Sequence, residues 1–246
     1  MKEDSSFKNV KKIIIETTSY CNRKCKYCPN YTVGRKSKLM KKTLFYKIIS
    51  NLKKYNFEGI ISPLGYGEPL TDPRLEGFVK YIKKKLPLSK IIIGTNGDFL
   101  TVKKYLNLKK KGVDCFFISN HVENPTSTAF KTINIIRKDH PSLLNAYFQD
   151  VKISINDKLF HNRGGLVNIK TKKYKKCPYT PIDQININVD GEVLFCCHDY
   201  LAKHTFGNVS NEDLYNIWNS KKYVNFRRLI EDGKFPYKMC KICTGN

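Results

Sequence analysis

Apolar residues in the first part of the chain fall into short blocks that alternate between two kinds of spacing. Runs of β-branched residues, as at 10–16, suit buried strands, whereas segments such as 42–55 repeat apolar residues at helical intervals. The pattern therefore predicts strands and helices in turn. The predicted strands are residues 10–16, 59–64, 90–95 and 113–119, and the predicted helices are residues 42–55, 72–85, 101–111 and 126–138.

This alternation predicts an α/β fold with a parallel sheet, because consecutive parallel strands are joined by right-handed crossovers through helices. A complete eight-stranded barrel takes about 250 residues, more than this segment offers. We therefore expect a partial, TIM-like (β/α)6 barrel. Its ligands should bind at the carboxyl ends of the strands, where the loops are rich in glycine.

The pattern changes from about residue 162. A glycine pair at Gly164 and Gly165 is followed by a lysine run, a hairpin signal at Asp190 and Gly191, and two short helical segments at 213–218 and 223–231. We expect two domains: a main domain over 1–160 and a small α+β domain over 161–246.

Composition limits the classes of protein that remain. Hydrophobic residues make up 41% of the 246 residues, which is typical of a globular protein. The longest apolar runs are far shorter than the roughly 20 residues of a membrane-spanning helix. The charged N-terminus does not resemble an export signal, so we expect a cytoplasmic protein without a membrane partner. Nine cysteines in clusters favour metal ligands over disulfides.

The net charge of +24 leaves alternatives open, since 45 Lys and Arg residues face only 21 Asp and Glu residues. Such a surface could hold a nucleic acid, an acidic peptide or a phosphorylated substrate. The lysines are spread along the whole chain, however, as on an ordinary solvated surface. No RNA motif with interleaved aromatic residues accompanies them, so the pattern does not favour a nucleic-acid partner.

The first cysteine cluster is Cys21, Cys25 and Cys28, spaced C-x3-C-x2-C after the first predicted strand. Structural zinc takes four protein ligands, and no fourth Cys or His lies nearby. A partial zinc site completed by a distant cysteine is the alternative. Three thiolates on an iron–sulfur cluster would leave one iron open to a chelating small molecule.

This loop resembles that of the radical S-adenosylmethionine (SAM) superfamily, with Tyr27 as the aromatic residue before the last cysteine. The resemblance implies a [4Fe–4S] cluster that binds SAM and cleaves it to a 5′-deoxyadenosyl radical, with electrons from a flavodoxin-type or ferredoxin-type protein. A loop after the second strand resembles the family's Gly-Gly-Glu-Pro motif, with Tyr66 in place of one glycine. The implied SAM contacts are Tyr27, Gly65, Tyr66, Gly67, Glu68, Pro69, Thr95, Asn96, Ser119 and Asn120.

The second cluster joins Cys177 and Cys196 to a C-x2-C pair, Cys240 and Cys243. A zinc ribbon explains this spacing as well as an iron–sulfur site does. The pattern resembles the shortened, twitch form of the SPASM auxiliary-cluster domain, which implies a second [4Fe–4S] cluster that transfers electrons. Cys115 is left as a core thiol. Cys197 has three interpretations: a residue without a role, an alternative ligand, or a hydrogen donor.

Nearly the whole chain resembles the 2-deoxy-scyllo-inosamine dehydrogenases, radical enzymes that oxidise an aminocyclitol alcohol to a ketone. The resemblance implies Arg163 as the base, although Arg163 could instead bind the substrate oxygen or brace the glycine turn. Tyr66 matches a substrate-pocket tyrosine. His198 stands in place of a substrate-binding glutamate, so we expect a different substrate.

Three functions follow from these residues. The leading hypothesis is a radical dehydrogenase of a small polyol, aminocyclitol or sugar-like alcohol. The second is a maturase that oxidises or epimerises a ribosomal peptide, with Cys197 returning hydrogen to a carbon radical. The third is a nucleic-acid-binding protein whose cysteines hold zinc.

Overall fold

Parallel strands form the centre of the computed structural model, which describes residues 7, 9–25, 27–120, 127–150, 162–169, 171–179 and 182–246. The strands are β1 (Lys12–Ile15), β2 (Ile60–Ser62), β3 (Lys90–Thr95), β4 (Cys115–Asn120), β5 (Ala146–Asp150), β6 (Gln184–Ile187), β7 (Glu192–Leu194) and β8 (Thr205–Asn208). The α-helices are α1 (Pro29–Thr32), α2 (Lys42–Lys54), α3 (Leu75–Lys85), α4 (Val102–Lys111), α5 (Thr128–Asp139), α6 (Leu214–Trp218), α7 (Lys221–Glu231) and α8 (Lys238–Thr244).

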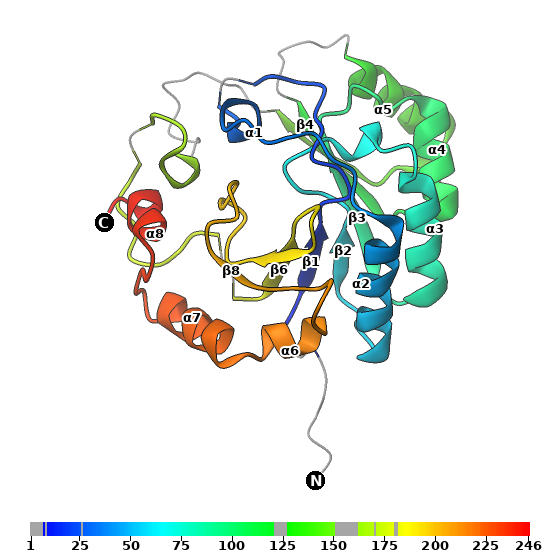
Figure 1. Cartoon of the computed structure of the whole chain (residues 1–246). Helices are drawn as coiled ribbons and strands as arrows, with labels where there is room; N and C mark the ends of the chain where they lie inside the picture. Colours follow the sequence, from blue (N-terminus) through cyan, green and yellow to red (C-terminus); the bar gives the residue numbers. More distant parts are fainter. Residues whose placement is uncertain are drawn as a thin grey trace.

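All eight strands belong to one sheet, in the order β5-β4-β3-β2-β1-β6-β7-β8. The six strands from β5 to β6 are parallel, and β7 and β8 are antiparallel additions at the end. Figure 1 shows helices α2 to α5 along one side of this sheet and α7 and α8 on the opposite side of the molecule. The α/β class and the partial barrel are thus confirmed.

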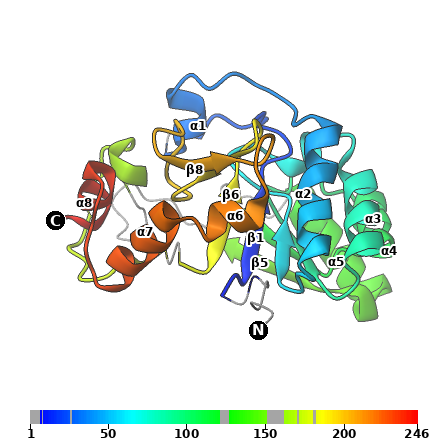
Figure 2. The same cartoon turned by 60° about the horizontal axis from the view of Figure 1, so that its bottom comes forward.

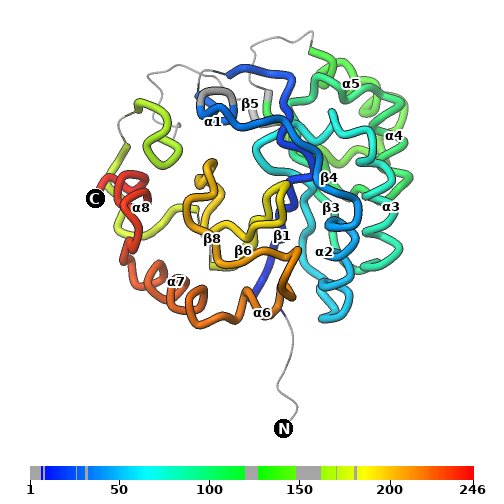
Figure 3. Tube along the Cα trace, in the orientation of Figure 1, coloured from blue at the N-terminus to red at the C-terminus, as the bar shows by residue number. Residues whose placement is uncertain are grey.

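The C-terminal part of the chain supplies the sixth parallel strand. In β6, Ile185 pairs with Ile13 of β1, so β6 continues the sheet of the N-terminal part. The tube in Figure 3 shows β6 beside β1, and the turned view of Figure 2 agrees, whereas β8 forms the far edge of the sheet. The predicted domain boundary at 160/161 falls outside the described residues. The two expected domains share one sheet across the described part.

The predicted elements of the N-terminal part are present, with ends that differ by a few residues. Helix α3 begins at Leu75 and not at residue 72, because a short 3-10 turn over Pro69–Thr71 comes first. The segments β5, β8, α1 and α8 were not predicted. The predicted hairpin at Asp190 is β6–β7, and Gly191 adopts the positive φ of 85° that its turn requires.

The helices bury one apolar face each against the sheet. Helix α2 buries Phe45 and Ile48, and α3 buries Phe78, whose ring stacks on that of Phe45 at a centroid distance of 4.0 Å. Thr101 and Ser127 cap α4 and α5 by accepting hydrogen bonds from backbone N–H groups of the first turn. No helix in the described residues combines the length and the apolar character needed to cross a bilayer.

Gly67 allows the loop after β2 to lie against the segment that leads into the first cysteine loop. A Cβ at this position would lie 2.6 Å from the backbone oxygen of Tyr20, and the next residue, Glu68, donates its N–H to that same oxygen at 2.8 Å. The loop after β2 is therefore pressed against the segment that leads into the cysteine loop. Because backbone atoms oppose the missing side chain, neither loop can yield by changing a rotamer.

We predict that Gly67→Ala lowers the free energy of unfolding by about 1–3 kcal/mol, because the added methyl overpacks two backbones. Gly77 is the matched control, since it lies in α3 with nothing within 4 Å of its added Cβ. Gly77→Ala should raise stability by about 0.5–1 kcal/mol. The apparent melting temperature, measured by circular dichroism without oxygen, checks both; equal shifts in the two variants would contradict the close approach.

Candidate functional site

The cysteine loop lies over the carboxyl ends of β1 and β3. Arg23 binds Asp98 of the loop after β3, with its Nε 2.8 Å from Oδ2. Asn22 donates to the same Oδ2 at 2.7 Å, and Asn96 donates to Asn22 Oδ1 at 2.9 Å. These contacts hold the loop in place without using its thiols.

The thiols of Cys21, Cys25 and Cys28 do not all converge on one point. Among the described residues, the only group of three potential ligand atoms within 4.8 Å of one another is formed by Cys196, Cys197 and His198. Cys21, Cys25 and Cys28 do not form such a group, whereas the thiolate ligands of one zinc ion each lie about 2.3 Å from the metal. Such spacing fits thiolates that bind separate corners of a cluster.

Burial raises the pKa values of Cys21 and Cys28, so these thiols need a cation to lose their protons at neutral pH. Burial also raises the pKa of Tyr27, with a contribution from the neighbouring Cys25. The residue that was predicted from the motif therefore lies against the thiols.

The loop of Gly65 to Pro69 is bound to the end of β3 through Glu68. This carboxylate is 3% exposed and accepts hydrogen bonds from Thr95 Oγ1 and from the N–H of Asn96, both at 2.7 Å. A third hydrogen bond comes from the N–H of Leu70. Glu68 and Thr95, both predicted SAM contacts, thus bind each other in this structure and shape the loops around the cysteines.

The remaining predicted SAM contacts lie on the neighbouring strand ends. The Asn96 side chain reaches toward the cysteine loop, with Nδ2 4.0 Å from Cys21 Sγ. Pro69 is buried and begins the 3-10 turn after Glu68. Ser119 lies at the end of β4 and is partly exposed, and the Asn120 side chain is outside the described part of the structure.

Glu16 is a site residue that the sequence analysis missed. It follows β1 and is 2% exposed, and both of its oxygens bind Arg35, at 2.9 and 2.8 Å. The same carboxylate accepts the N–H groups of Tyr66 at 3.0 Å and Val189 at 3.1 Å. A Cβ on Gly65 would lie 2.5 Å from the Glu16 side chain. One carboxylate therefore joins the cysteine-loop segment, the loop after β2 and the β6–β7 turn.

The second set of cysteines gathers beside α8. Cys240 and Cys243 are three residues apart on this helix, so they share a face, and Cys196 follows β7. Burial, followed by the proximity of Cys177, raises the pKa of Cys240 to about 11 and that of Cys243 to about 12. Crowded, buried thiols of this kind become thiolates only when a metal compensates their charge, so this donor set fits a cluster.

Four residues that the sequence offers as catalytic or substrate-binding candidates line one cavity of about 180 Å³: Tyr66, Arg163, Cys197 and His198. The cavity lies between the two cysteine sites, because Arg163 is near Cys28 and His198 is near Cys243. The ring of Tyr66 stacks on that of Tyr200 at 4.1 Å. Hydrogen bonding from Cys196 and the cation of Arg163 lower the pKa of Cys197. The structure thus brings together these four residues from three separate segments of the chain.

Several polar atoms in this cavity wall have no partner. Tyr66 Oη, Arg163 Nε and Asn186 Nδ2 are buried and make no hydrogen bond with any residue that the structure describes. Asn186 was not predicted, although β6 carries a signal: Gln184, Asn186 and Asn188 alternate with buried isoleucines. Polar residues on one face of a central strand indicate a lined cavity. Because unpaired buried groups are costly, these three atoms indicate a polar ligand.

Arg163 reaches the cavity from a strained turn. It adopts a positive φ of 50°, and Gly164 and Gly165 follow with φ of 67° and 91°. The turn packs on α8, because a Cβ on Gly164 would lie 2.7 Å from Met239. The N–H of Gly164 also donates to Cys243. The turn that carries Arg163 is therefore held by the helix of the second cysteine set.

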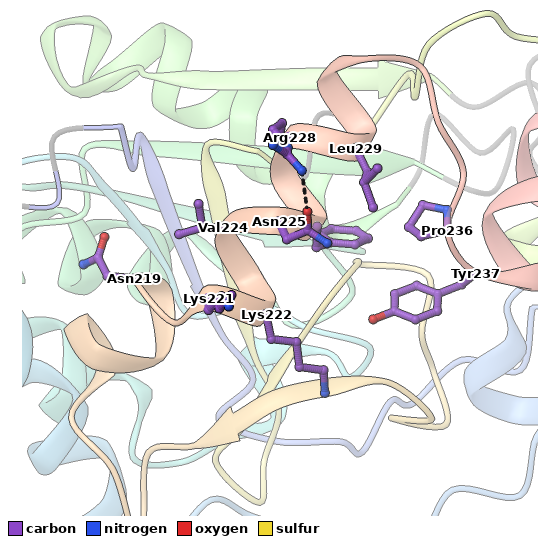
Figure 4. A pocket seen from close by; sticks show the side chains of 10 residues that line it. Asn219, Lys221, Lys222, Val224, Asn225, Arg228, Leu229, Pro236 and Tyr237 are labelled. Atoms are coloured by element: carbon purple, nitrogen blue, oxygen red, sulfur yellow. Dashed lines mark hydrogen bonds between the residues drawn. The ribbon is translucent and has the colours of Figure 1, made fainter.

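A larger depression, of about 920 Å³, lies elsewhere, along α7 and the segment that leads to α8. Figure 4 shows Lys221, Lys222 and Arg228 on the helix around this groove, and Leu229 and Pro236 beside it. Arg228 binds the side chain of Asn225 at 2.9 Å. None of the predicted site residues lines this groove, so size alone does not identify the site.

Two family models match the chain. The model of the radical SAM superfamily matches residues 15–142, and that of the SPASM iron–sulfur cluster-binding domain matches residues 177–244. The chain is 31% identical to the S-adenosyl-L-methionine-dependent 2-deoxy-scyllo-inosamine dehydrogenase of Niallia circulans, over 94% of this chain and 92% of the relative. It is 25% identical to the tungsten-containing aldehyde ferredoxin oxidoreductase cofactor-modifying protein of Pyrococcus furiosus, over 96% of this chain and 87% of that protein.

Solved structures agree with these matches. The crystal structure of BtrN in complex with AdoMet and 2-DOIA superposes with a TM-score of 0.84 at 29% identity, covering 95% of this chain and 92% of that one. The structure of anSMEcpe with bound AdoMet has a TM-score of 0.63 at 15% identity, covering 95% and 88%, and shows a shared fold. The predicted [4Fe–4S] clusters and SAM are confirmed as cofactors, which replaces the zinc interpretations of both cysteine sets. The chain belongs to the radical SAM superfamily and is an oxidoreductase with a C-terminal SPASM domain.

Proposed function

We propose that this enzyme oxidises an alcohol carbon of a small polyol, aminocyclitol or sugar to a ketone. The observation that carries the proposal is the cavity between the two cysteine sites, with its three unpaired polar atoms on Tyr66, Arg163 and Asn186. A ligand rich in hydroxyl or amino groups supplies the missing hydrogen bonds. The dehydrogenase relative, whose name specifies an aminocyclitol, supports the same substrate class.

Each cysteine set is assigned to one cluster in this proposal. Cys21, Cys25 and Cys28 hold the cluster that binds SAM, and Cys177, Cys196, Cys240 and Cys243 hold the auxiliary cluster. When bound, SAM and the first cluster would supply a 5′-deoxyadenosyl radical able to take the hydrogen atom of the carbinol carbon, the auxiliary cluster would accept the remaining electron, and the hydroxyl proton would leave to water. The loops of Gly65 to Pro69, Thr95 to Asn96 and Ser119 to Asn120 surround SAM.

The cavity residues bind and orient the substrate. We assign Arg163 to binding the reacting oxygen through its unpaired Nε, since a guanidinium donates hydrogen bonds and holds its protons. Tyr66 Oη and Asn186 Nδ2 bind further hydroxyl or amino groups. The volume of about 180 Å³ suits one small molecule and leaves little room for a peptide segment.

We place the enzyme in the cytoplasm, where a small flavodoxin-type or ferredoxin-type protein reduces the first cluster. The nine free cysteines support a reducing compartment. The net charge of +24 favours an acidic electron donor.

The assignment of ligands predicts the iron content of cysteine variants. Cys28→Ala and Cys243→Ala should each lower the iron bound per chain by about half after anaerobic reconstitution, because each removes one cluster and leaves the other. Cys115→Ala should bind as much iron as the native chain, since Cys115 lies buried in β4. Iron and sulfide analysis measures this; full iron content in Cys243→Ala would contradict the auxiliary site.

The reaction is tested by hydrogen transfer. With reductant and SAM, aminocyclitols and sugars deuterated at the carbinol carbon should transfer deuterium into 5′-deoxyadenosine, detected by mass spectrometry, and yield the ketone. Cys197→Ala should keep this turnover, because a dehydrogenase returns no hydrogen to its substrate. Deuterium transfer from peptides alone would establish the maturase hypothesis instead, and loss of an epimerised product in Cys197→Ala would identify Cys197 as its hydrogen donor.

Removal of an unpaired polar atom from the cavity wall should stabilise the fold and weaken substrate binding at the same time. We expect Tyr66→Phe to raise the free energy of unfolding by about 1–3 kcal/mol, because a buried unpaired hydroxyl disappears. Its KM for the substrate should rise roughly three- to tenfold through the loss of one hydrogen bond. Asn186→Leu should raise KM in the same way.

Tyr223 provides the control, since its hydroxyl is also buried and unpaired but does not line the cavity. Tyr223→Phe should gain stability with an unchanged KM. Thermal unfolding gives the stability and steady-state kinetics give KM. A native KM in both Tyr66→Phe and Asn186→Leu would contradict the assignment of this cavity to the substrate.

A further inference from the structure

His198 lies between the substrate cavity and the second cysteine set. Its side chain is 2% exposed, and the two nitrogens of its ring face different partners. Nε2 is 3.4 Å from Arg163 Nη1, and Nδ1 is 3.6 Å from Cys243 Sγ. One imidazole therefore spans from a substrate-binding cation to a thiol that we assign as a cluster ligand.

The partner of Nε2 determines which ring nitrogen carries the proton. A guanidinium has only donors, so Nε2 must accept the hydrogen bond from Arg163. A neutral imidazole that accepts at one nitrogen carries its proton on the other. Nδ1–H therefore points at Cys243 Sγ and donates to it, and this sulfur accepts well as a thiolate.

The surroundings hold the ring in this orientation. Tyr179 contacts it edge-on, at a centroid distance of 4.3 Å and an interplanar angle of 68°. The backbone N–H of His198 donates to Cys196 Sγ at 3.4 Å, so the residue is also attached to a second assigned ligand. Arg163 itself is held in place because the glycine turn that carries it packs against α8.

We propose that His198 is a positioning residue of the auxiliary cluster, which donates a hydrogen bond from Nδ1 to Cys243 and raises the reduction potential of that cluster. The proposal rests on the cluster assignment made under the proposed function. A hydrogen bond to a ligand sulfur withdraws negative charge from it and favours the reduced state, which has one more electron. An electron acceptor beside the substrate gains driving force in this way.

Three substitutions separate the two hydrogen bonds of the ring. His198→Asn places an amide nitrogen near the position of Nδ1 and can still donate to Cys243. His198→Gln extends its amide to the level of Nε2, where it meets Arg163 but not the sulfur. His198→Phe keeps the size of the ring and loses both hydrogen bonds.

The measurement is the midpoint potential of the auxiliary cluster, followed by EPR during a redox titration of the full chain. Replacing Cys21, Cys25 and Cys28 with alanine removes the first cluster, so only the auxiliary signal remains. We expect a lower potential in His198→Phe and His198→Gln, and a potential close to native in His198→Asn. Iron analysis first establishes that each variant holds its cluster.

Two results would overturn the proposal: native potentials in both His198→Phe and His198→Gln, or an equal fall in His198→Asn and His198→Gln. If His198→Phe cannot hold a cluster, the comparison of His198→Asn with His198→Gln still tests the proposal. The potential is read without substrate or SAM, so it stands apart from the deuterium-transfer test. Failure of that test with a lowered potential in His198→Gln would reject the proposed substrate and keep the role of His198.

Discussion

The buried carboxylate of Glu16 is the interaction on which the site depends. A charge that is taken out of water must be matched by a countercharge and by hydrogen bonds, and Glu16 has both: Arg35 on its two oxygens and the N–H groups of Tyr66 and Val189. These partners come from the cysteine-loop segment, the loop after β2 and the β6–β7 turn. Loss of the carboxylate would remove the ion-pair partner of Arg35 and the acceptor of two backbone N–H groups, so these three segments share one electrostatic centre.

Much of the fold follows from local patterns, and the remainder depends on distant contacts. The spacing of apolar residues predicts strands β1 to β4 and helices α2 to α5. Strand β5 does not, because it lies at the edge of the sheet, where Tyr147 is 66% exposed. The position of β6 beside β1 could not be predicted from spacing, since it is decided by pairing between residues far apart in the chain.

The residues of the site also divide into those that the sequence predicts and those that depend on distant contacts. Spacing alone identified the cysteines as ligands, and resemblance added the residues of the cavity, including Tyr66 and Arg163. Glu16 and Asn186 were missed, although the alternation of polar residues in β6 carried a usable signal. The partners of His198 had no such signal, because its contacts with Arg163 and Cys243 arise only when the turn and α8 meet.

The pairing of β1 with β6 has a consequence for how the protein matures. Lys12 is made early during synthesis and its neighbour Gln184 late, so one edge of β1 stays open while most of the chain emerges. Contacts this far apart in sequence slow folding, because a long loop must close before they form. The first cysteine loop extends from β1 and therefore gains its final surroundings only after β6 has docked, so its three thiols are fully positioned for a cluster only when nearly the whole chain has folded.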